Sequence, residues 1–508
     1  MKKAWYSRIE GLKGPLVMYF MGMILLGVGN SFTSSNEIVT NTLEALKYTG
    51  GLIKTLFPFF LVINVIGKAH EDSVPILGGV FSYIIMHLTT MYVAPQNLSS
   101  SYYSALGDGL LNIVGQDLNK APINLGLIAS ILAIVMVTAI YKLSRQRFNY
   151  GIFTFIDNDT WFIIMIIIAS ILSGVLLSWG FRYVVNTINT IMTFISGNST
   201  NPAALFIYGL LERVMEILNL DEIVHSSFWT GLFGGSWVDS AGVTYYGDVN
   251  IWTAQIAQGS VQLGVGKYIS PYYIINIFVV PAMIIALLLQ YTNRIERNRI
   301  IGLAILAILV SLSSGCLLPL EYLLLLTAPA LLICLIVLTS GLYLVMAMME
   351  VYLGFSFSGA LVFATPGTLL EFTKLSSYLG RNTSRSFVWI GIIAAIIAFA
   401  MVFLYYYVLA FDFMDPTKRK MHRKEIIRAL GGLGNIRIVD ASPSRISVAV
   451  MDTHKIKPAV LMNLGAYEVR EAFFCHYVYF GPASLAIARE IRKELKNYNK
   501  ITKFIEAK

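Results

Sequence analysis

The stretch WFIIMIIIASILSGVLLSWGF, at residues 161–181, carries no charged side chain and is as long as a helix that crosses a bilayer. Backbone polar groups in lipid must be satisfied inside their own segment, so such a run favours an α-helix. Further apolar runs occur at residues 15–32, 52–66, 76–92, 123–141, 272–289, 300–314, 323–348 and 386–409. Some of them are shorter than the roughly 20 residues of a full span, so short or tilted helices are expected. The sequence therefore predicts a polytopic α-helical membrane protein with about nine or ten transmembrane helices.

The composition agrees with this prediction and excludes a secreted soluble protein. The chain has 508 residues, of which 56% are hydrophobic and 13% are charged. Soluble domains are roughly 25% charged. The first apolar run follows MKKAWYSRIEGLKG and has no small-residue cleavage pattern before Phe32, so we interpret it as a retained helix and not as a signal peptide.

The formal net charge is +9, and the basic residues cluster at the ends of the apolar runs. The clusters are Lys2, Lys3 and Arg8; Lys142, Arg145 and Arg147; Arg294, Arg297 and Arg299; and Lys418, Arg419, Lys420, Arg423 and Lys424. This pattern is typical of positive-inside topology and not of a nucleic-acid-binding patch. It predicts a multi-pass protein in the lipid bilayer with both termini in the cytoplasm. The three cysteines fit no metal-ligand spacing, and no metal or cofactor is expected.

Two segments are too polar for a span and too apolar for an ordinary loop. They are residues 201–266 and 354–372, and the second reads GFSFSGALVFATPGTLLEF. Non-helical backbone at membrane depth is tolerated only when protein or a cavity surrounds it. We therefore expect re-entrant or broken elements with a substrate site between them.

The character of the chain changes after residue 409. The expected organisation is a membrane domain at residues 1–411, a linker at 412–424, a cytoplasmic domain at 425–498 and a tail at 499–508. IRIVDASPSRISVAV, at 436–450, predicts two strands joined by a short loop, and FFCHYVYFG, at 473–481, predicts another strand. Helices are expected at 425–430, 457–464 and 483–495. The segment is thus a small α/β domain with an antiparallel sheet.

Several motifs occur together in one order. They are ILLGVGNSF (24–32), GLLERVMEILNLDEIVHSSFW (209–229), WVDSAGVTYYGDVNIWTAQIAQG (237–259), GCLLPLEYLLLLTAP (315–329), GFSFSGAL (354–361) and NIRIVDASPSRISVAV (435–450). The chain resembles the glucose branch of the bacterial phosphotransferase-system (PTS) permeases, in which a membrane IIC domain is followed by a cytoplasmic IIB domain. The resemblance covers nearly the whole chain. It implies a homodimer in the bacterial cell membrane.

The resemblance also implies a chemistry. In the family, a cysteine of the IIB domain receives a phosphoryl group from a partner IIA protein, because a thiolate is a good nucleophile. The IIC domain binds a hexose-type sugar at mid-membrane and offers its 6-hydroxyl to that phosphate. A histidine and a glutamate hold the sugar, and positioning and charge stabilisation dominate phosphoryl transfer.

This sequence departs from the family in the phosphate-accepting loop. Ser442 stands at the phosphocysteine position, Ser444 stands at the position of a threonine, and Ser447 at that of the second arginine. Pro443 removes one backbone N–H donor from the loop. A glutamine of the later strand has become Tyr477. Asp440, Ser444 and Arg445 are what the resemblance leaves of the phosphate-accepting loop around Ser442. Asp440, Ser442 and Ser444 are equally explained as turn residues.

The membrane domain departs at matching positions. Asp221 and Glu222 align with the family's His-His pair, and Leu318 aligns with the first glutamate of Thr-Glu-Pro. Arg213 and Glu321 remain, and intramembrane charges of this kind are usually functional. There are two alternatives to a functional role. In the first, Arg213 and Glu321 form a structural ion pair; in the second, Asp221 and Glu222 form a solvated helix end.

The family's phosphocysteine thiol, its sugar-site histidine and its sugar-site glutamate are all replaced in this sequence. Their combined loss predicts a relative that binds or translocates a hexose without phosphorylating it, so enzyme activity is doubtful. A sensor or regulatory protein that uses the IIB-like domain as a docking module for a cytoplasmic partner is one alternative. A working permease that uses an intact IIB domain in trans is another. A ligand that is not a sugar also remains open, because Leu318 makes the site more apolar while Asp221 and Glu222 make it acidic.

Overall fold

The computed structural model describes residues 2–32, 34–70, 72–104, 120–145, 157–259, 261–292, 294–357, 359–379, 381–409, 416–472 and 475–506. Within these ranges, eight helices are long and apolar enough to cross a membrane, and the apolar helix at 300–314 is shorter. A small antiparallel sheet with helices follows near the C-terminus. The predicted fold class, a polytopic helical membrane protein with a small C-terminal α/β domain, is confirmed.

The N-terminal part of the bundle is made of long helices. They are α1 (Lys2–Ser31), α2 (Glu37–Ala69), α3 (Ser73–Val93), α4 (Gly126–Ser144) and α5 (Asn158–Gly197). The α1–α2 contact is close because Gly50 has no side chain: a Cβ at that position would lie 2.5 Å from the carbonyl oxygen of Gly22. Gly50 thus allows the two backbones to pack against each other.

The segment from residue 201 to residue 266 is broken into short elements, as expected. They are α6 (Pro202–Ile217), α7 (Asp221–His225), the π-helical turn η4 (Ser226–Thr230), the short turn η5 (Leu232–Gly234), the hairpin strands β1 (Ser236–Val238) and β2 (Thr244–Tyr246), and α8 (Asp248–Ala257). The chain reverses between α6 and α7 at Asn219, whose φ is 57°. Asparagine tolerates this left-handed conformation better than most residues. The turn brings Asp221 back beside α6.

The next elements complete the bundle. They are α9 (Ser270–Ile274), η6 (Ile275–Val279), α10 (Val280–Leu289), α11 (Arg294–Ser314), α12 (Leu318–Thr327), α13 (Pro329–Met348), η7 (Leu361–Phe363), α14 (Leu369–Leu375), η8 (Ser376–Tyr378), α15 (Arg381–Leu404) and η9 (Tyr405–Leu409). The span expected over residues 323–348 is present but begins only at Pro329, because the shorter helix α12 ends at Thr327. Pro329 lacks an N–H and disfavours a helical conformation at Ala328, whose φ and ψ are −151° and 69°.

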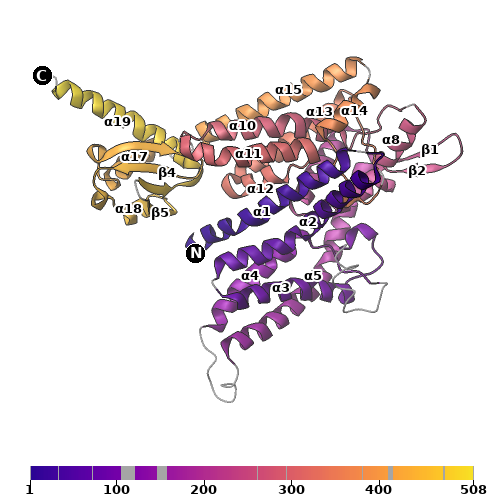
Figure 1. Cartoon of the computed structure of the whole chain (residues 1–508), viewed down its shortest axis with the longest axis horizontal. Helices are drawn as coiled ribbons and strands as arrows, with labels where there is room; N and C mark the ends of the chain where they lie inside the picture. Colours follow the sequence, from indigo (N-terminus) through magenta and orange to yellow (C-terminus); the bar gives the residue numbers. More distant parts are fainter. Residues whose placement is uncertain are drawn as a thin grey trace.

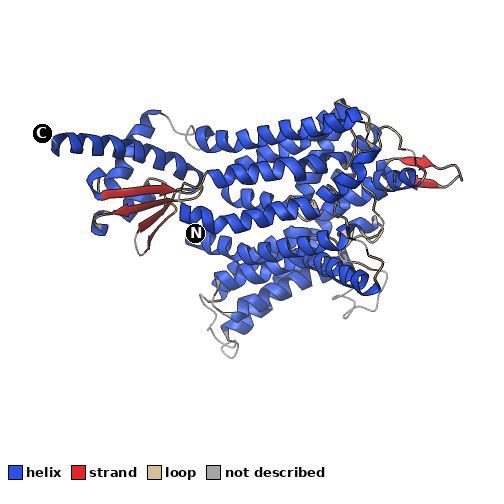
Figure 2. Cartoon of the chain, turned by 45° about the horizontal axis from the view of Figure 1, so that its top comes forward, coloured by secondary structure: helices blue, strands red, loops and turns tan. Residues whose placement is uncertain are grey.

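The C-terminal domain contains α17 (Pro416–Ala429), β3 (Ile436–Ala441), β4 (Ile446–Val450), α18 (Pro458–Asn463), β5 (Glu468–Ala472), β6 (Cys475–Tyr479) and α19 (Ser484–Glu506). The sheet is antiparallel with the strand order β3-β4-β6-β5. Figure 2 shows its strands in red beside the helices of this domain. The sequence did not predict β5. Helix α17 begins inside the range expected as a linker, and α19 continues through most of the range expected as a tail.

The two ends of the membrane bundle carry different structures. The C-terminal domain lies at the end where α1 begins, and the β1–β2 hairpin lies at the opposite end (Figure 1). The C-terminal domain touches the bundle through Thr292, which follows α10. The Thr292 hydroxyl donates to the Ala441 carbonyl oxygen at 2.9 Å and accepts from the Ala441 N–H at 3.1 Å. Arg492 of α19 donates to the same hydroxyl at 2.8 Å, so the tip of β3 is fixed against the bundle.

Candidate functional site

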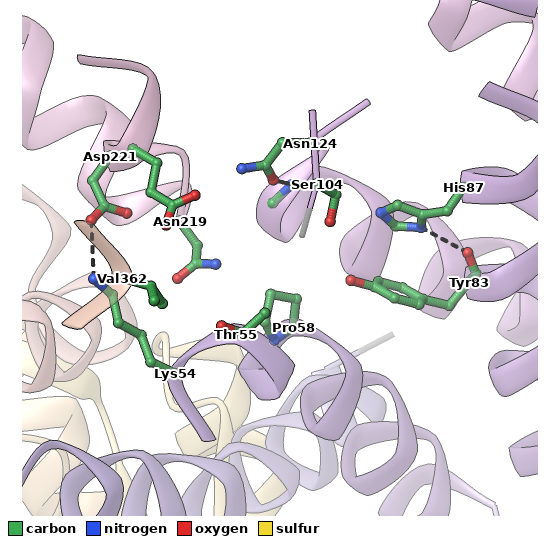
Figure 3. A pocket seen from close by; sticks show the side chains of 12 residues that line it. Lys54, Thr55, Pro58, Tyr83, His87, Ser104, Asn124, Asn219, Asp221 and Val362 are labelled. Carbon is green, nitrogen blue, oxygen red and sulfur yellow. Dashed lines mark hydrogen bonds and ion pairs between the residues drawn. The ribbon is translucent and has the colours of Figure 1, made fainter. Parts of the chain in front are cut away.

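A pocket that opens partly to solvent, with about 530 Å³ of empty volume, lies among the N-terminal helices and the α6–α7 turn. Its lining includes Lys54, Thr55, Pro58, Tyr83, His87, Ser104, Asn124, Gly126, Asn219, Asp221, Glu222 and Val362. Lys54 and Asp221 face each other on one side of the cavity, and His87 and Tyr83 lie on the other (Figure 3). The Lys54 Nζ lies 3.4 Å from Asp221 Oδ2. Hydroxyls, amides, a charged pair and an aromatic ring therefore converge on one space.

A second cavity, also partly open to solvent and with about 400 Å³ of empty volume, shares Lys54 and Asp221 with the first. Its lining also includes Glu216, His225, Trp229, Tyr272 and Leu318. The two cavities form what we call the central site, because the Lys54–Asp221 pair belongs to both. Leu318 contributes an apolar wall to the central site.

A buried charge network lies behind the second cavity, and Arg213 is its centre. The Arg213 guanidinium lies 2.7 Å from a carboxylate oxygen of Glu216 and 3.5 Å from one of Glu212. Its distance to Glu321 Oε1 is 3.9 Å. The side chains of Arg213, Glu212 and Glu321 are at most 1% exposed. A buried charge is costly unless it is paired, so one guanidinium balances several carboxylates here.

His225 joins this network to the central site. Its Nε2 lies 3.2 Å from Glu212 Oε1 and 3.0 Å from the Tyr272 hydroxyl, while its Nδ1 lies 3.6 Å from Asp221 Oδ2. The imidazole stacks on the Trp229 ring at a centroid distance of 3.7 Å. Tyr343 also donates to Glu212. Asp221, His225, Glu212 and Arg213 thus form a continuous polar path.

The structure separates the predicted membrane residues into two layers. Asp221, Glu222 and Leu318 line the cavities, whereas Arg213 and Glu321 lie behind them and line neither. Sequence reasoning missed Lys54 as a residue of the site. A lysine within an apolar run was a detectable signal, because intramembrane charges are rare and usually paired.

Asp248 is a further buried carboxylate, near the β1–β2 end of the bundle. It accepts the N–H of Gly266 at 2.8 Å and that of Tyr268 at 3.2 Å. Burial raises the pKa of the Asp248 carboxyl to about 6, although these two hydrogen bonds oppose the rise. The contacts tie the start of α8 to the chain before α9, which is a structural role.

The β3–β4 loop holds Ser442 and the residues next to it. Ser442 is buried, with 2% of its surface exposed. Its N–H donates to the Arg445 carbonyl oxygen at 2.9 Å, and its hydroxyl lies 3.4 Å from the same oxygen. Pro443 contributes to an apolar cavity together with membrane-domain residues. The loop is therefore closed on itself and faces the bundle.

Arg445, the cationic residue of the loop, contacts two tyrosines. The Arg445 guanidinium lies 4.1 Å from the centroid of the Tyr477 ring, and its Nη1 donates to the Tyr479 hydroxyl at 3.0 Å. Asp440 pairs with Arg492 at 3.2 Å. An arginine packed on aromatic rings gains cation–π stabilisation, which a phosphate would have to replace. The Ser444 carbonyl accepts from the Gly481 N–H at 3.0 Å.

Cys475 and His476 lie away from this loop. In the sheet register, Ile446 faces Val478, Val448 faces His476, and Ala472 faces Cys475. The loop joins β4 at Ile446, so Cys475 is three residues further along β6, about 10 Å at 3.3 Å per residue. The register therefore places Cys475 away from the start of β4.

A buried polar site between broken helices of a polytopic bundle defines a membrane protein of the transporter type. The chain belongs to the phosphotransferase system EIIC family, which it matches over residues 15–341. It is 25% identical over 479 residues to the PTS system glucose-specific EIICBA component of Staphylococcus saprophyticus subsp. saprophyticus, covering 91% of this chain and 67% of that protein.

A solved structure was also matched. It is the crystal structure of the transporter ChbC, the IIC component of the N,N'-diacetylchitobiose-specific phosphotransferase system. The match covers 79% of this chain and 91% of that chain, with 13% identity and a TM-score of 0.29. This score is too low to carry an argument about the present fold.

Proposed function

We propose that the protein binds and translocates a hexose-type sugar without phosphorylating it. Membership of the EIIC family and the relation to a glucose-specific component support a sugar as the ligand. The central site supports it too, because its lining offers Asp221, Asn124 and Asn219 to hydroxyl groups and Tyr83 and Trp229 to the apolar faces of a ring.

The β3–β4 loop is the observation that carries the absence of phosphorylation. Ser442 is a weak nucleophile without an adjacent base, and its hydroxyl is buried against the Arg445 carbonyl. The Arg445 side chain is packed on Tyr477 and bonded to Tyr479, so it does not face an open anion site. Leu318 supports the same conclusion in the membrane domain, because it has no acid–base or hydrogen-bonding chemistry.

The test uses the full-length protein in proteoliposomes with labelled glucose, followed by separation of free and phosphorylated sugar. We expect exchange of labelled glucose across the membrane. We expect no glucose 6-phosphate when phosphoenolpyruvate and the general phosphotransfer proteins are supplied. Formation of phosphorylated sugar under these conditions would overturn the proposal. Absence of both glucose binding and glucose exchange would overturn the assignment of a sugar as the ligand.

A second arm adds an intact glucose IIB domain. Formation of glucose 6-phosphate only in this arm would favour the permease that uses IIB in trans. The contacts of Thr292 with Ala441 and Arg492 argue against that possibility, because the resident domain already occupies this face of the bundle.

The second candidate function is a sensor that uses the C-terminal domain as a docking module. It is favoured by one observation: the domain keeps a complete sheet and its contact with Thr292 while the loop chemistry is changed. Capture of a IIA-type or regulatory cytoplasmic protein by the full chain, in a manner that changes with glucose, would support this function.

The orientation and organisation are part of the same proposal. Both termini are assigned to the cytoplasm, and α1 begins at the end of the bundle that carries the C-terminal domain (Figure 1). The proposed division is 1–411 for the membrane domain, 412–424 for the linker, 425–498 for the IIB-like domain and 499–508 for the tail. A homodimer is proposed from the family and is tested by light scattering of the detergent-solubilised protein.

A further inference from the structure

Glu321 is a buried carboxylate for which the surrounding protein supplies little compensation. Its side chain is 0% exposed, and neither carboxylate oxygen has a hydrogen-bond partner among the residues that the structure describes. The nearest cation is Arg213, at 3.9 Å, which is beyond hydrogen-bond distance. An ionised carboxylate in such surroundings is strongly disfavoured, and the group instead takes up a proton.

The charge network as a whole also lacks positive charge. Within the described part of the chain, its carboxylates are Glu212, Glu216, Asp221 and Glu321, and its permanent cations are Lys54 and Arg213. By this count, the network holds two more carboxylates than permanent cations. Burial of this excess charge is costly, so the network has to bind protons or another cation.

Arg213 connects Glu321 to the central site. It makes its short contact, 2.7 Å, with Glu216, which lines the second cavity. When Glu321 is protonated, this contact is retained, and Arg213 holds Glu216 in place as an acceptor for a ligand hydroxyl. When Glu321 ionises, Coulomb attraction draws the guanidinium towards it and away from Glu216, which loses its fixed position in the cavity wall. Proton binding at Glu321 and ligand binding in the cavity therefore favour each other.

We propose that Glu321 is the proton-binding site of a sugar–proton cotransport cycle, with Arg213 as the residue that couples it to the central site. One proton adds to a Glu321 carboxylate oxygen from water on one side of the membrane. It crosses as the neutral acid and returns to water on the other side when the carboxylate re-forms. This inference rests on the proposed function, since a permease without phosphorylation needs another source of free energy to accumulate sugar.

Other groups around Glu321 bear on its titration. Within the described residues, Glu212, Arg213 and Glu216 of α6 face Glu321, as does Tyr322 of its own helix. The titratable side chains that bond to these residues are Tyr208 of α6, His225 of α7, Tyr272 of α9 and Tyr343 of α13, and Cys316 beside Tyr322 bonds to Tyr19 of α1. Arg213 is the one permanent cation in this set. The coupling is therefore assigned to the pair Arg213–Glu321.

The experiment places the full-length protein in proteoliposomes and measures labelled glucose in two ways. Counterflow, in which internal unlabelled glucose exchanges for external label, needs no proton gradient and reports translocation alone. Accumulation is measured with about pH 6 outside and about pH 7.5 inside, where one proton per sugar supports up to about 30-fold concentration. A trapped pH dye reports the acidification of the lumen that accompanies uptake.

Glu321→Gln keeps the shape of the side chain and removes its titration. We expect this variant to retain counterflow and to lose both accumulation and lumen acidification. Glu44→Gln, on an exposed position of α2, is the matched control and is expected to retain all three signals.

The outcomes separate the inference from the proposed function. Wild-type counterflow without proton-driven accumulation overturns the inference and leaves the permease intact. Accumulation that persists in Glu321→Gln overturns the assignment of the site. Absence of wild-type counterflow removes the proposed function and the inference with it. The wild-type measurements decide the coupling even if the variant does not fold.

Discussion

Replacement of Lys54 by methionine tests whether the central site depends on the Lys54–Asp221 pair. The charges lie 3.4 Å apart, and the two side chains are 14% and 9% exposed. At this distance the gross Coulomb energy is about 5 kcal/mol for an effective dielectric constant of about 20. Removing one partner of a buried pair costs roughly 3–5 kcal/mol, because the other charge is left uncompensated. His225, at 3.6 Å from Asp221, offers partial compensation, so we expect about 3 kcal/mol.

The assay is a double-mutant cycle on the free energy of unfolding. The proteins are unfolded in dodecyl maltoside with increasing SDS and followed by tryptophan fluorescence. Lys54→Met and Asp221→Asn are each expected to destabilise the protein, and the double variant is expected to cost about 2 kcal/mol less than the sum. Lys142→Met, at an exposed position, is the control and is expected to change stability by less than about 0.5 kcal/mol. Strict additivity of the two central substitutions would refute the pairing.

Three further predictions concern separate parts of the chain. Ser442→Cys is expected not to restore glucose phosphorylation by the full chain, because Arg445 remains packed on aromatic rings; glucose 6-phosphate formation by this variant would contradict our account of the loop. Thr292→Val removes the hydroxyl that bonds Ala441, and each lost hydrogen bond costs about 1 kcal/mol. We expect this variant to lower the hydrogen-exchange protection of the Ala441 amide. Thr187→Val, on the exposed face of α5, is the control and is expected to leave that protection unchanged. Asp248 has a raised pKa of about 6, so the folded state binds more protons than the unfolded state between about pH 4 and 6, and stability falls as pH rises through that window. Relative to Asp248→Asn, the wild type is therefore expected to gain about 1 kcal/mol on acidification from about pH 7 to 5, and an unchanged difference would show that burial does not raise this pKa.

The positions of the loop residues illustrate what the sequence could and could not provide. The alternation of apolar residues in IRIVDASPSRISVAV predicted β3, β4 and the short loop between them, because strand periodicity is a local property. The packing of Arg445 on Tyr477 was not predictable from it. That contact depends on β6 pairing with β4, and the pairing places Ser447 opposite Tyr477.

The membrane domain divides in the same way. Its class follows from the sequence alone, since a charge-free run such as 161–181 is stable in lipid only as a helix that satisfies its own backbone. Which buried charges compensate one another was decided by the tertiary structure. Lys54 and Asp221 are 167 positions apart, and His225 reaches Asp221 and Glu212 only because the chain reverses at Asn219. Apolar length is encoded locally, whereas the pairing of buried charges depends on contacts between distant segments, which no periodicity records.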